Sequence, residues 1–512
     1  MPTSLPASSS ASATDPAPVP APDTSAYPIA SPFVSPFVPP IPRVLSILSD
    51  AELAARLAQA DARVGGADWT GALACYLRTI EHAPLAFQSY LGLTRVFEAL
   101  GRGHDALACR AAALALEAGT ALDLYNLGTA YLMTGHLPQA EAWYRLALLR
   151  DPALVVAHRN LAAVLRDLGR TAEAQTHLDA AYRRQHCFDN QRAAPAVLLI
   201  CAAGRGNVPL DVWFPPASMR RIEYMVEYAP EDDDARLAEM LPPAAVLFNA
   251  IGDADVLRPS LARVERLCER FGRRVMNAPL AVARTARDAL AVTLSGLDDV
   301  IVPPAWRLEH AEVEQAVRAA HAREPASSWL LRPVATHGGE GLRRIDPAQA
   351  AAFRLDSDPS TESVKSDQWY LTRFVETRCD DGFYRKYRMV LIDGVPYPYH
   401  LAIASHWLVH YFSADMLADA GKQAEEGEFL ARPGTVLGGR AMAALAAIGA
   451  RLELQYAGVD FTLLPDGRVL VFEANATMLV HREVPRSPLA YKNPHIERMC
   501  EAFLAMRERY TG

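Results

Sequence analysis

The sequence predicts a multidomain protein in which an all-α repeat region precedes an α/β domain and a final α+β domain. Three observations support this fold class. Small residues recur at a 34-residue period up to about residue 186, and short apolar runs alternate with helical patterns after Asn190. From about residue 306, β-hairpin patterns mix with helices. The chain of 512 residues is also longer than one hydrophobic core usually serves.

The composition is that of an ordinary globular protein, with 51% apolar residues, 21% charged residues and a net charge of -8. This balance provides no overall positive field for nucleic acid. Seven scattered cysteines without a Cys-x-x-Cys pair indicate a reduced, cytoplasmic chain without a thiolate metal site. The first cationic residue is Arg43, and prolines interrupt the N-terminal apolar stretch. We therefore expect no signal peptide, no membrane span and no membrane partner.

Residues 1–48 are predicted to form a disordered tail rich in Pro, Ala and Ser. The first 45 residues hold 12 of the 37 prolines of the chain. Such a segment cannot bury enough apolar surface to offset the entropy lost on ordering. The alternative role is that of a docking tail for a partner.

Residues 49–188 are predicted to form about four helical repeats. The period of 34 residues separates the alanines at 72, 106, 140 and 174, and likewise the glycines at 101, 135 and 169. The clearest copy reads "LYNLGTAYLMTGHLPQAEAWYRLALLRDP". This region resembles the tetratricopeptide repeat (TPR), and the resemblance implies an α-solenoid that recruits a peptide or protein partner. Self-association into a homo-oligomer, or support of the next domain, are the alternatives.

Residues 194–305 are predicted to form a small α/β domain. The runs "APAVLLICAAG", "RRIEYMVEYAP" and "AAVLFNAIGDAD" are typical of buried strands, and "PSLARVERLCERFG" is typical of a helix before the segment "RRVMNAP". Ligands bind at the carboxyl ends of such strands. The catalytic domain is then expected over residues 306–512.

A hairpin near the C-terminus carries the strongest chemical signal. In "AGVDFTLLPDGRVLVFEAN" the residues Pro-Asp-Gly form the turn, and alternation from Val469 places residues 471, 473 and 475 on one face. Glu473 and Asn475 then point the same way and converge with Asp460 across the antiparallel pair. Two carboxylates and an amide oxygen are hard ligands that suit Mg²⁺. The competing interpretation is a solvated hairpin face.

Two further segments provide groups for an anion. "LLRPVATHGGEGLRRI" places Arg332 before a loop whose glycines, Gly338, Gly339 and Gly341, allow backbone N–H groups to approach phosphate oxygens. A glycine-rich turn without phosphate is equally consistent with this motif alone. Downstream, Arg385, Lys386 and Arg388 alternate with apolar residues, so part of this cluster faces inward and requires an anion.

Four motifs follow one another in this order: the glycine-rich loop, a hinge around Phe374 and Val375, the basic strand with Arg385 to Arg388, and the hairpin with Asp460, Glu473 and Asn475. This order resembles the ATP-grasp superfamily, most closely its prokaryotic glutathione synthetase-like branch. The resemblance spans about residues 195 to 485, with residues 194–305 as the lobe that precedes the ATP-grasp domain. It implies a ligase in which ATP phosphorylates a carboxylate and an amine or other nucleophile attacks the acyl-phosphate. Peptide or natural-product biosynthesis would fit this chemistry.

The resemblance implies a role for each matching residue. Asp460, Glu473 and Asn475 hold one or two Mg²⁺ ions, with Mn²⁺ as an alternative ion. Arg332 stands where the family normally has Lys, which leaves its contact to phosphate open. The remaining predicted contacts are Gly338, Gly339 and Gly341 over the phosphates, Phe374 and Val375 at the adenine, Glu376 or Asp381 at the ribose, Arg388 at the reacting phosphoryl group, supported by Arg385 and Lys386, and His400, Thr477, His481 and Arg482 near the substrates.

Two other functions remain compatible with these residues. The ATP-grasp fold of a scaffold protein would bind nucleotide without turnover, and the repeats would then perform its function. A phosphotransferase would use the same metal ions and stop at phosphate transfer. The complete D…E-x-N set argues against the scaffold, whereas the exchange of Lys for Arg at position 332 is consistent with it. The sequence does not identify the acyl donor or the nucleophile.

Overall fold

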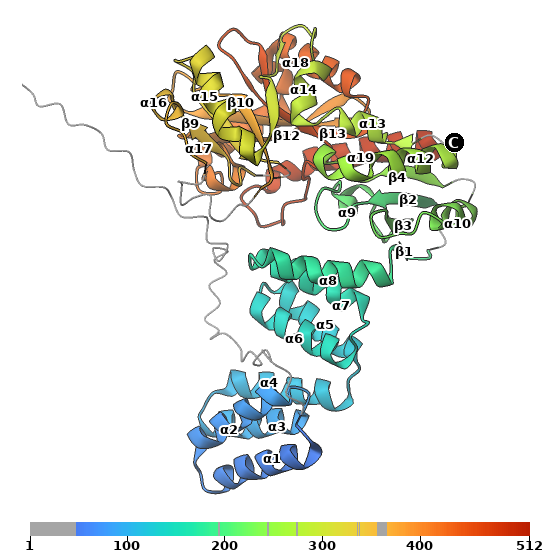
Figure 1. The fold of residues 1–512 in the computed structure, drawn as a ribbon, viewed down its shortest axis with the longest axis vertical. Coiled ribbons are helices and arrows are strands. Elements are labelled where there is room, and N and C mark those ends of the chain that lie inside the picture. The colour runs from blue at the N-terminus through green and yellow to red at the C-terminus, as the bar shows by residue number, and fades with distance from the viewer. Residues whose placement is uncertain are drawn as a thin grey trace, which may run out of the picture. The chain divides into compact units, whose positions relative to one another are not determined.

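The computed structural model describes residues 48–192, 195–242, 245–272, 275–334, 336, 338–355 and 366–511. The predicted tail over 1–48 lies outside the described residues except for its last position. Contacts divide the chain into two compact units, one ending at Pro152 and one beginning at Ala153. Each unit is shown in Figure 1.

The first unit is helical, and its helices pack as consecutive pairs (Figure 1). They are α1 (Asp50–Gly65), α2 (Trp69–His82), α3 (Phe87–Ala99), α4 (Gly103–Ala118), α5 (Ala121–Met133) and α6 (Leu137–Arg150). The pair α7 (Val155–Asp167) and α8 (Thr171–Arg184) repeats this pattern within the second unit.

The 34-residue period has a local structural cause. Gly101, Gly135 and Gly169 each lie two residues beyond the first helix of a pair, with φ of 69°, 78° and 75°. Glycine adopts this left-handed conformation without a steric cost, so it ends each of these helices. The alanines at the same period, 72, 106, 140 and 174, are buried in the second helix of each pair. The region is therefore helical and periodic, and its identity as a TPR solenoid stays a prediction.

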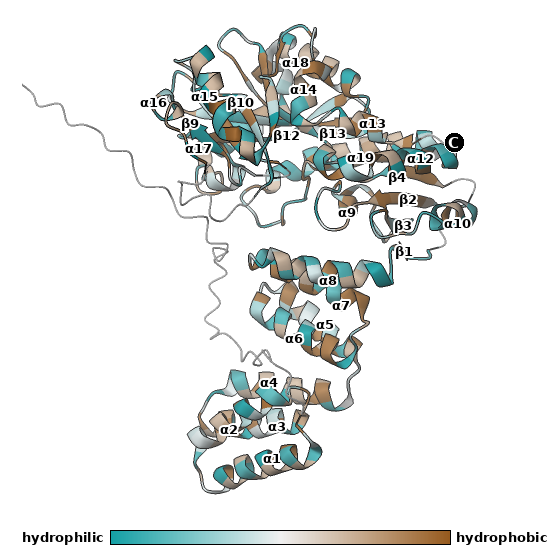
Figure 2. Cartoon of the chain, in the orientation of Figure 1, coloured by the Kyte–Doolittle hydropathy of each residue, from teal (hydrophilic) through white to brown (hydrophobic). Residues whose placement is uncertain are grey.

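The second unit continues with a five-stranded sheet whose order is β1-β3-β2-β4-β5. All neighbours are parallel except β1 and β3. Figure 2 shows β2 and β4 as largely hydrophobic, and both strands are fully buried. The strands are β1 (Cys187–Asp189), β2 (Ala196–Cys201), β3 (Arg220–Met225), β4 (Val246–Asn249) and β5 (Val275–Met276). The helices are α9 (Leu210–Trp213), α10 (Asp233–Met240), α11 (Ala254–Leu257), η1 (Arg258–Ser260), α12 (Leu261–Phe271), α13 (Pro279–Ala283) and α14 (Arg287–Thr293).

A second, antiparallel sheet has the order β7-β10-β8-β9 and its own hydrophobic core against α15. Its strands are β7 (Ala305–Glu309), β8 (Trp329–Pro333), β9 (Arg343–Ile345) and β10 (Gln368–Arg373). Its helices are η2 (His310–Glu312), α15 (Val313–Arg323) and α16 (Pro347–Ala350).

The third sheet has the order β12-β11-β13-β14-β6 and carries the predicted hairpin. Its strands are β6 (Val300–Ile301), β11 (Tyr384–Ile392), β12 (Val395–Ala404), β13 (Tyr456–Leu463) and β14 (Val469–Asn475). The helices are η4 (Tyr411–Ser413), α17 (Ala420–Ala431), α18 (Pro433–Leu452), η5 (Ala490–Lys492) and α19 (Asn493–Thr511). One continuous core joins this sheet to the first sheet.

The strand β6 lies before the domain boundary that the sequence predicts at residue 305, but it pairs with a strand of the domain beyond that boundary. Val300 and Ile301 pair in parallel with Val469 and Leu470 of the hairpin. A strand of two residues has too few positions to show a period, which is why the sequence pattern does not reveal it.

One helix within the described residues, α18, is long and apolar enough to cross a membrane by length and composition. Its residues Ala441, Leu445 and Ile448 lie in the core beneath the first and third sheets. This packing is that of a helix in the core of a globular domain.

Asn277 ties the first sheet to the third. Its side chain, fully buried, accepts a hydrogen bond from the backbone N–H of Tyr456 at 2.9 Å and donates to the Tyr456 carbonyl at 3.0 Å. The backbone at Asn277 is left-handed, with φ of 53°, which Asn tolerates better than most residues. The Asn277 side chain thus acts as a hook: it pairs the backbone N–H and carbonyl of Tyr456, the first residue of β13.

Replacing Asn277 with Ala is expected to lower the free energy of unfolding by about 2–3 kcal/mol, because two buried backbone groups lose their partners. Urea unfolding of the full chain measures the loss. Gln191 is a suitable control, since it is also left-handed, with φ of 51°, but exposed. A loss in Asn277→Ala no larger than in Gln191→Ala would contradict the proposed role of the hook.

Candidate active site

A cavity of about 850 Å³ lies among the three sheets of the second unit. It brings together most residues that the sequence predicts for an active site. Those that line it are Arg332, Gly338, Gly339, Phe374, Val375, Arg385, Lys386, Arg388, His400, Asp460, Glu473, Asn475, Thr477 and His481. The residues that line it also include Arg205, Arg287, Arg373 and Lys492, so cations outnumber the two acids. The cavity is therefore positively charged within a protein of net charge -8.

One wall is a row of polar residues across four strands of the third sheet. Backbone register pairs His400 with Arg388, Arg388 with Asp460, and Asp460 with Glu473. Asn475 pairs with Gly458 two positions further along the hairpin. Residues far apart in the sequence thus occupy neighbouring strands.

A β-bulge adjusts the hairpin at this row. Asp460 pairs with Glu473 but Phe461 pairs with Val471, so Phe472 has no partner in the register. Val471 pairs with Phe461, and both side chains belong to the hydrophobic core, whereas Glu473 pairs with Asp460 on the opposite face of the hairpin. The expectation that residues 471, 473 and 475 share one face is therefore wrong for Val471, because simple alternation cannot anticipate an inserted residue.

Asp460 is almost completely buried and is held by two cations. Arg388 donates to both carboxylate oxygens, Nε to Oδ1 at 2.6 Å and Nη2 to Oδ2 at 2.8 Å, and Lys386 Nζ lies 3.2 Å from Oδ2. Burial alone would raise the pKa of Asp460, but the charges of Arg388 and Lys386 outweigh it and hold the pKa far below its usual value. Asp460 is thus ionised and fixed in orientation.

Glu473 has a cationic partner that the sequence analysis does not identify. Arg287, the first residue of α14, donates to the Glu473 carboxylate and, at 3.2 Å, to the Phe472 carbonyl. Burial lowers the pKa of Arg287. Arg287 lies 186 positions from Glu473 and in the preceding domain, so no local motif connects the two residues.

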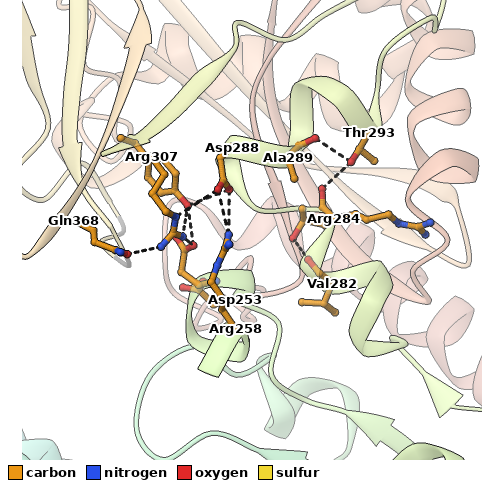
Figure 3. A network of polar contacts seen from close by, with 12 residues as sticks. Asp253, Arg258, Val282, Arg284, Asp288, Ala289, Thr293, Arg307 and Gln368 are labelled. Carbon is orange, nitrogen blue, oxygen red and sulfur yellow. Dashed lines mark hydrogen bonds and ion pairs between the residues drawn. The ribbon is translucent and has the colours of Figure 1, made fainter. Parts of the chain in front are cut away.

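A polar network holds the start of α14 in place (Figure 3). Asp288 accepts from Arg258 Nη2 at 3.3 Å, and Arg307 lies between Asp288 and Gln368, to which it donates at 2.7 Å. Arg307 also pairs with Asp255 and donates to the Tyr370 hydroxyl at 2.6 Å. These contacts join α11, α14, β7 and β10, so the first turn of α14, which carries Arg287, is anchored to several elements.

The opposite wall contains Arg332 and the glycine-rich loop. Arg332, on β8, donates to the Thr336 carbonyl, and no described residue forms an ion pair with it, although the charges of Asp255 and Asp253 act on it at longer range. Burial, followed by the neighbouring Arg287 charge, lowers the pKa of Arg332 well below its usual value. Two partly buried guanidinium groups close together, with Glu473 as the one ion-pair partner between them, are an environment that favours a bound anion.

The glycines adopt backbone conformations that disfavour other residues. Gly338, Gly339 and Gly341 have φ of 64°, 85° and 66°. A Cβ on Gly339 would also lie 3.2 Å from Leu408, because the loop approaches the opposite segment closely. The loop can therefore cover a ligand at short range with its backbone.

An apolar pocket follows at the predicted adenine position. Phe374 and Val375 lie directly after β10, and the Trp407 ring packs edge-on against Phe374 at 5.7 Å between centroids. The Arg344 guanidinium covers the Phe374 ring at 4.1 Å. Leu342 and Leu408 also line this part of the cavity. A flat heteroaromatic ring fits such surroundings.

Four predicted residues do not line the cavity. Arg482 pairs with exposed Glu497 at 2.6 Å, and Asp381 pairs with Arg385 at 2.7 Å. Arg385 itself lines the cavity but its guanidinium is also bound by Glu425 at 2.5 Å. The other two residues are Gly341 and Glu376, whose carboxylate caps its own following backbone N–H groups.

The residues present fit a hard divalent cation. Among the described residues no three His, Cys, Asp or Glu side chains gather into a metal site. The candidate set instead consists of two carboxylates and the Asn475 amide oxygen, which accepts hydrogen bonds from the Thr477 N–H and hydroxyl at 2.9 Å. These hydrogen bonds orient the amide but engage both lone pairs of its oxygen, whereas the carboxylate oxygens of Asp460 and Glu473 retain lone pairs beside their Arg partners, so the two acids are the main candidate ligands.

Several solved structures are similar to the second unit. D-cycloserine synthetase DcsG aligns with 60% of this chain and 99% of its own, at 16% identity and a TM-score of 0.33. D-alanyl-alanine synthetase A from Vibrio cholerae O1 biovar eltor aligns with 62% and 99%, at 14% identity and a TM-score of 0.37. The ATP-grasp ligase PsnB, complexed with a variant of its minimal precursor, Mg and ADP, aligns with 62% and 100%, at 14% identity and a TM-score of 0.34. No protein-family model and no curated protein sequence matches the chain.

Proposed function

We propose that the protein is an ATP-dependent carboxylate–amine ligase that acts through an acyl-phosphate. The observation that carries this proposal is the arrangement of one cavity, in which a glycine-rich loop and Arg332 face a wall bearing Arg388, Asp460, Glu473 and Asn475. A surplus of partly buried cations, together with the oxygen atoms of Asp460, Glu473 and Asn475 on the same cavity, suits a nucleoside triphosphate with Mg²⁺.

In this proposal the residues of the chain act by binding and orientation. Arg332 and the backbone N–H groups of Gly338 and Gly339 bind the phosphate oxygens, while Arg388 orients the reacting phosphoryl group. The substrate carboxylate oxygen attacks the γ-phosphorus and ADP leaves; the amine nitrogen then attacks the acyl carbon, and phosphate leaves as the nitrogen loses a proton. The chain needs no nucleophilic side chain of its own for these steps.

Asp460, Glu473 and Asn475 would hold one or two Mg²⁺ ions, with Mn²⁺ as an alternative. Such an ion supplies neutralisation of charge between the β- and γ-phosphates. Arg287 and Arg388 would keep the two carboxylates aligned. Glu376 or Asp381 would reach the ribose only after rearrangement, since neither lines the cavity.

The helical repeats would present a peptide or protein partner, and the cytoplasm is the proposed location. The support for recruitment is the repeat pattern itself, whose buried alanines and left-handed glycines are typical of arrays that bind partners on an open surface. A single chain would then both bind the partner through its repeats and carry out the ligation in its cavity.

Hydroxylamine trapping tests the reaction. Protein supplied with ATP, Mg²⁺ and a panel of amino acids and short peptides is expected to release ADP and, with hydroxylamine, to form a hydroxamate with at least one acid. A stable phosphorylated product in place of the hydroxamate would show a phosphotransferase. Nucleotide binding without ADP release over the whole panel would show a scaffold.

A further inference from the structure

A second group of polar side chains lies on the cavity beyond Arg388. His400 on β12 is the register partner of Arg388, and Asp460 lies on the other side of Arg388. Neighbouring strands are about 4.8 Å apart, so the His400 backbone lies about 10 Å from that of Asp460. This part of the wall is therefore spatially separate from the candidate metal ligands.

Lys492 is the cation of this region, and it is buried. Its residue is 2% exposed, and its ammonium group lies over the rings of Tyr411 at 4.4 Å and Tyr399 at 4.9 Å. Its nearest oxygen partners in the described part of the chain are the Tyr411 hydroxyl at 3.4 Å and Glu483 Oε1 at 3.7 Å. An ammonium group has three donors, so these long contacts leave hydrogen-bonding capacity for a ligand.

His400 has an unpaired nitrogen on the same cavity. Its ring stacks on Tyr411 with centroids 4.7 Å apart, and it is 5% exposed. The Nε2 atom is buried without a hydrogen-bond partner among the described residues. Burial, together with the charges of Arg388 and Lys492, lowers the pKa of His400 well below its usual value, so the ring is neutral and one nitrogen can donate.

The nearby acid is already engaged. Glu426 is fully buried and accepts hydrogen bonds from the Tyr411 hydroxyl at 2.9 Å, the Tyr491 hydroxyl at 2.6 Å and the Leu401 N–H at 3.0 Å. The Tyr411 hydroxyl lies between Glu426 and Lys492, and the Glu426 charge acts on Lys492 from beyond ion-pair distance and opposes the lowering of the Lys492 pKa by burial. The region thus combines a cation whose direct contacts are all long, although two acids lie near it, and an unpaired imidazole nitrogen.

We propose that Lys492 and His400 bind a second carboxylate of the substrate, distinct from the carboxylate that is activated. This inference rests on the proposed function, because the reacting carboxylate must lie near Arg388, Asp460 and Glu473. The substrate class is then an acid with two carboxylates several bonds apart, such as an acidic amino acid or a short peptide with an acidic residue. Lys492 pairs the charge, and His400 donates from Nε2.

This assignment also replaces a sequence-based expectation. The sequence analysis places Arg482 near the substrates, yet its guanidinium is bound by Glu497 outside the cavity. Lys492 lies ten positions further on, in η5, and turns into the cavity instead.

Calorimetric titration with matched acids and amides tests the proposal. The probes are glutarate, adipate, glutamate and the dipeptide Ala-Glu, each with a twin in which one carboxylate is an amide, in the presence of Mg²⁺ and a non-hydrolysable ATP analogue. At least one acid is expected to bind the wild type 10-fold or more tightly than its amide twin. Binding of no acid, or equal binding of the twins, would overturn the proposal.

Variants assign the preference to the two residues. Lys492→Gln is expected to reduce the acid–amide ratio to below 3-fold, and Lys492→Arg to restore most of it. His400→Phe retains a ring against Tyr411 and is expected to weaken the acid 3-fold to 10-fold. Lys422→Gln is the control, because Lys422 lies outside the cavity and donates to the Ala414 carbonyl. A ratio that survives in a folded Lys492→Gln protein would overturn the proposal.

Nucleotide binding separates this inference from the proposed function. Affinity for the ATP analogue is expected to stay within 2-fold of wild type in the Lys492 and His400 variants, which also confirms that they fold. If the wild-type protein binds nucleotide and forms a hydroxamate but shows no preference for the acid over its amide twin, only the proposed binding of a second carboxylate is overturned. A wild-type protein that binds no nucleotide overturns the proposed function itself.

Discussion

Glu473→Gln is expected to reduce Mg²⁺-dependent ADP release about 1,000-fold, which corresponds to about 4 kcal/mol of lost transition-state stabilisation. The substitution keeps the size of the side chain and removes its charge. It removes one of the charged ligands proposed for Mg²⁺ and weakens the ion pair with Arg287. Steady-state ADP release at saturating Mg²⁺ measures the effect.

Asp466→Asn provides the matched control for this experiment. Asp466 lies in the turn of the same hairpin, is half exposed and pairs with Arg468 at 2.7 Å. Its loss is expected to leave turnover within 2-fold of wild type. Turnover of Glu473→Gln equal to that of Asp466→Asn would remove Glu473 from the metal site.

Arg388→Met is expected to lower the free energy of unfolding at neutral pH by about 3–5 kcal/mol. The reason is that it removes the bidentate partner of Asp460, a carboxylate whose side chain is only 3% exposed. Removing one member of a buried ion pair leaves an uncompensated charge, and Lys386 alone offsets only part of it. Urea unfolding of the full chain measures the loss.

The same variant should show a defined dependence on pH. The pKa of Asp460 is depressed in the folded protein, so the pair contributes stability above the unfolded pKa of about 4 and loses that contribution as pH falls. The deficit of Arg388→Met relative to wild type should therefore shrink as the pH is lowered below about 4. A deficit that is constant down to acid pH would contradict the ion-pair explanation.

Arg468→Met is the control for stability. Arg468 also pairs with an acid of this hairpin, but both side chains are about half exposed. Exposed ion pairs contribute about 1 kcal/mol or less, so the loss should be small. Equal losses in Arg388→Met and Arg468→Met would show that burial of the Asp460 pair is not what stabilises the sheet.

Local patterns predict the features whose cause is local. The left-handed glycines after α3, α5 and α7 produce the period that the sequence shows, and the hairpin turn lies at the expected Pro-Asp-Gly. Arg332 and the glycine-rich loop follow one another within a few residues, so their position on one cavity wall also follows from the sequence. These features depend on backbone conformation and alternation within a single element.

Features that depend on distant partners could not be predicted in this way. The residues Arg287 and Lys492 reach the cavity from α14 and η5, and neither lies in a recognisable motif. The strand β6 is too short to show periodicity, and the bulge at Phe472 becomes evident only when β14 is paired with β13. The pairing of Arg482 with Glu497 likewise depends on where α19 packs.

The sequence by itself determined the order of the parts, the helical period, the hairpin and the chemical character of its acids, because each depends on neighbours along the chain. Only the tertiary structure decided which charges meet. It set His400, Arg388, Asp460 and Glu473 in one row across four strands and placed Lys492 at its end. Strand register and packing bring together residues that are tens to hundreds of positions apart in the sequence. The pKa values of these residues depend on burial and on neighbouring charges, so they are set only in the folded protein.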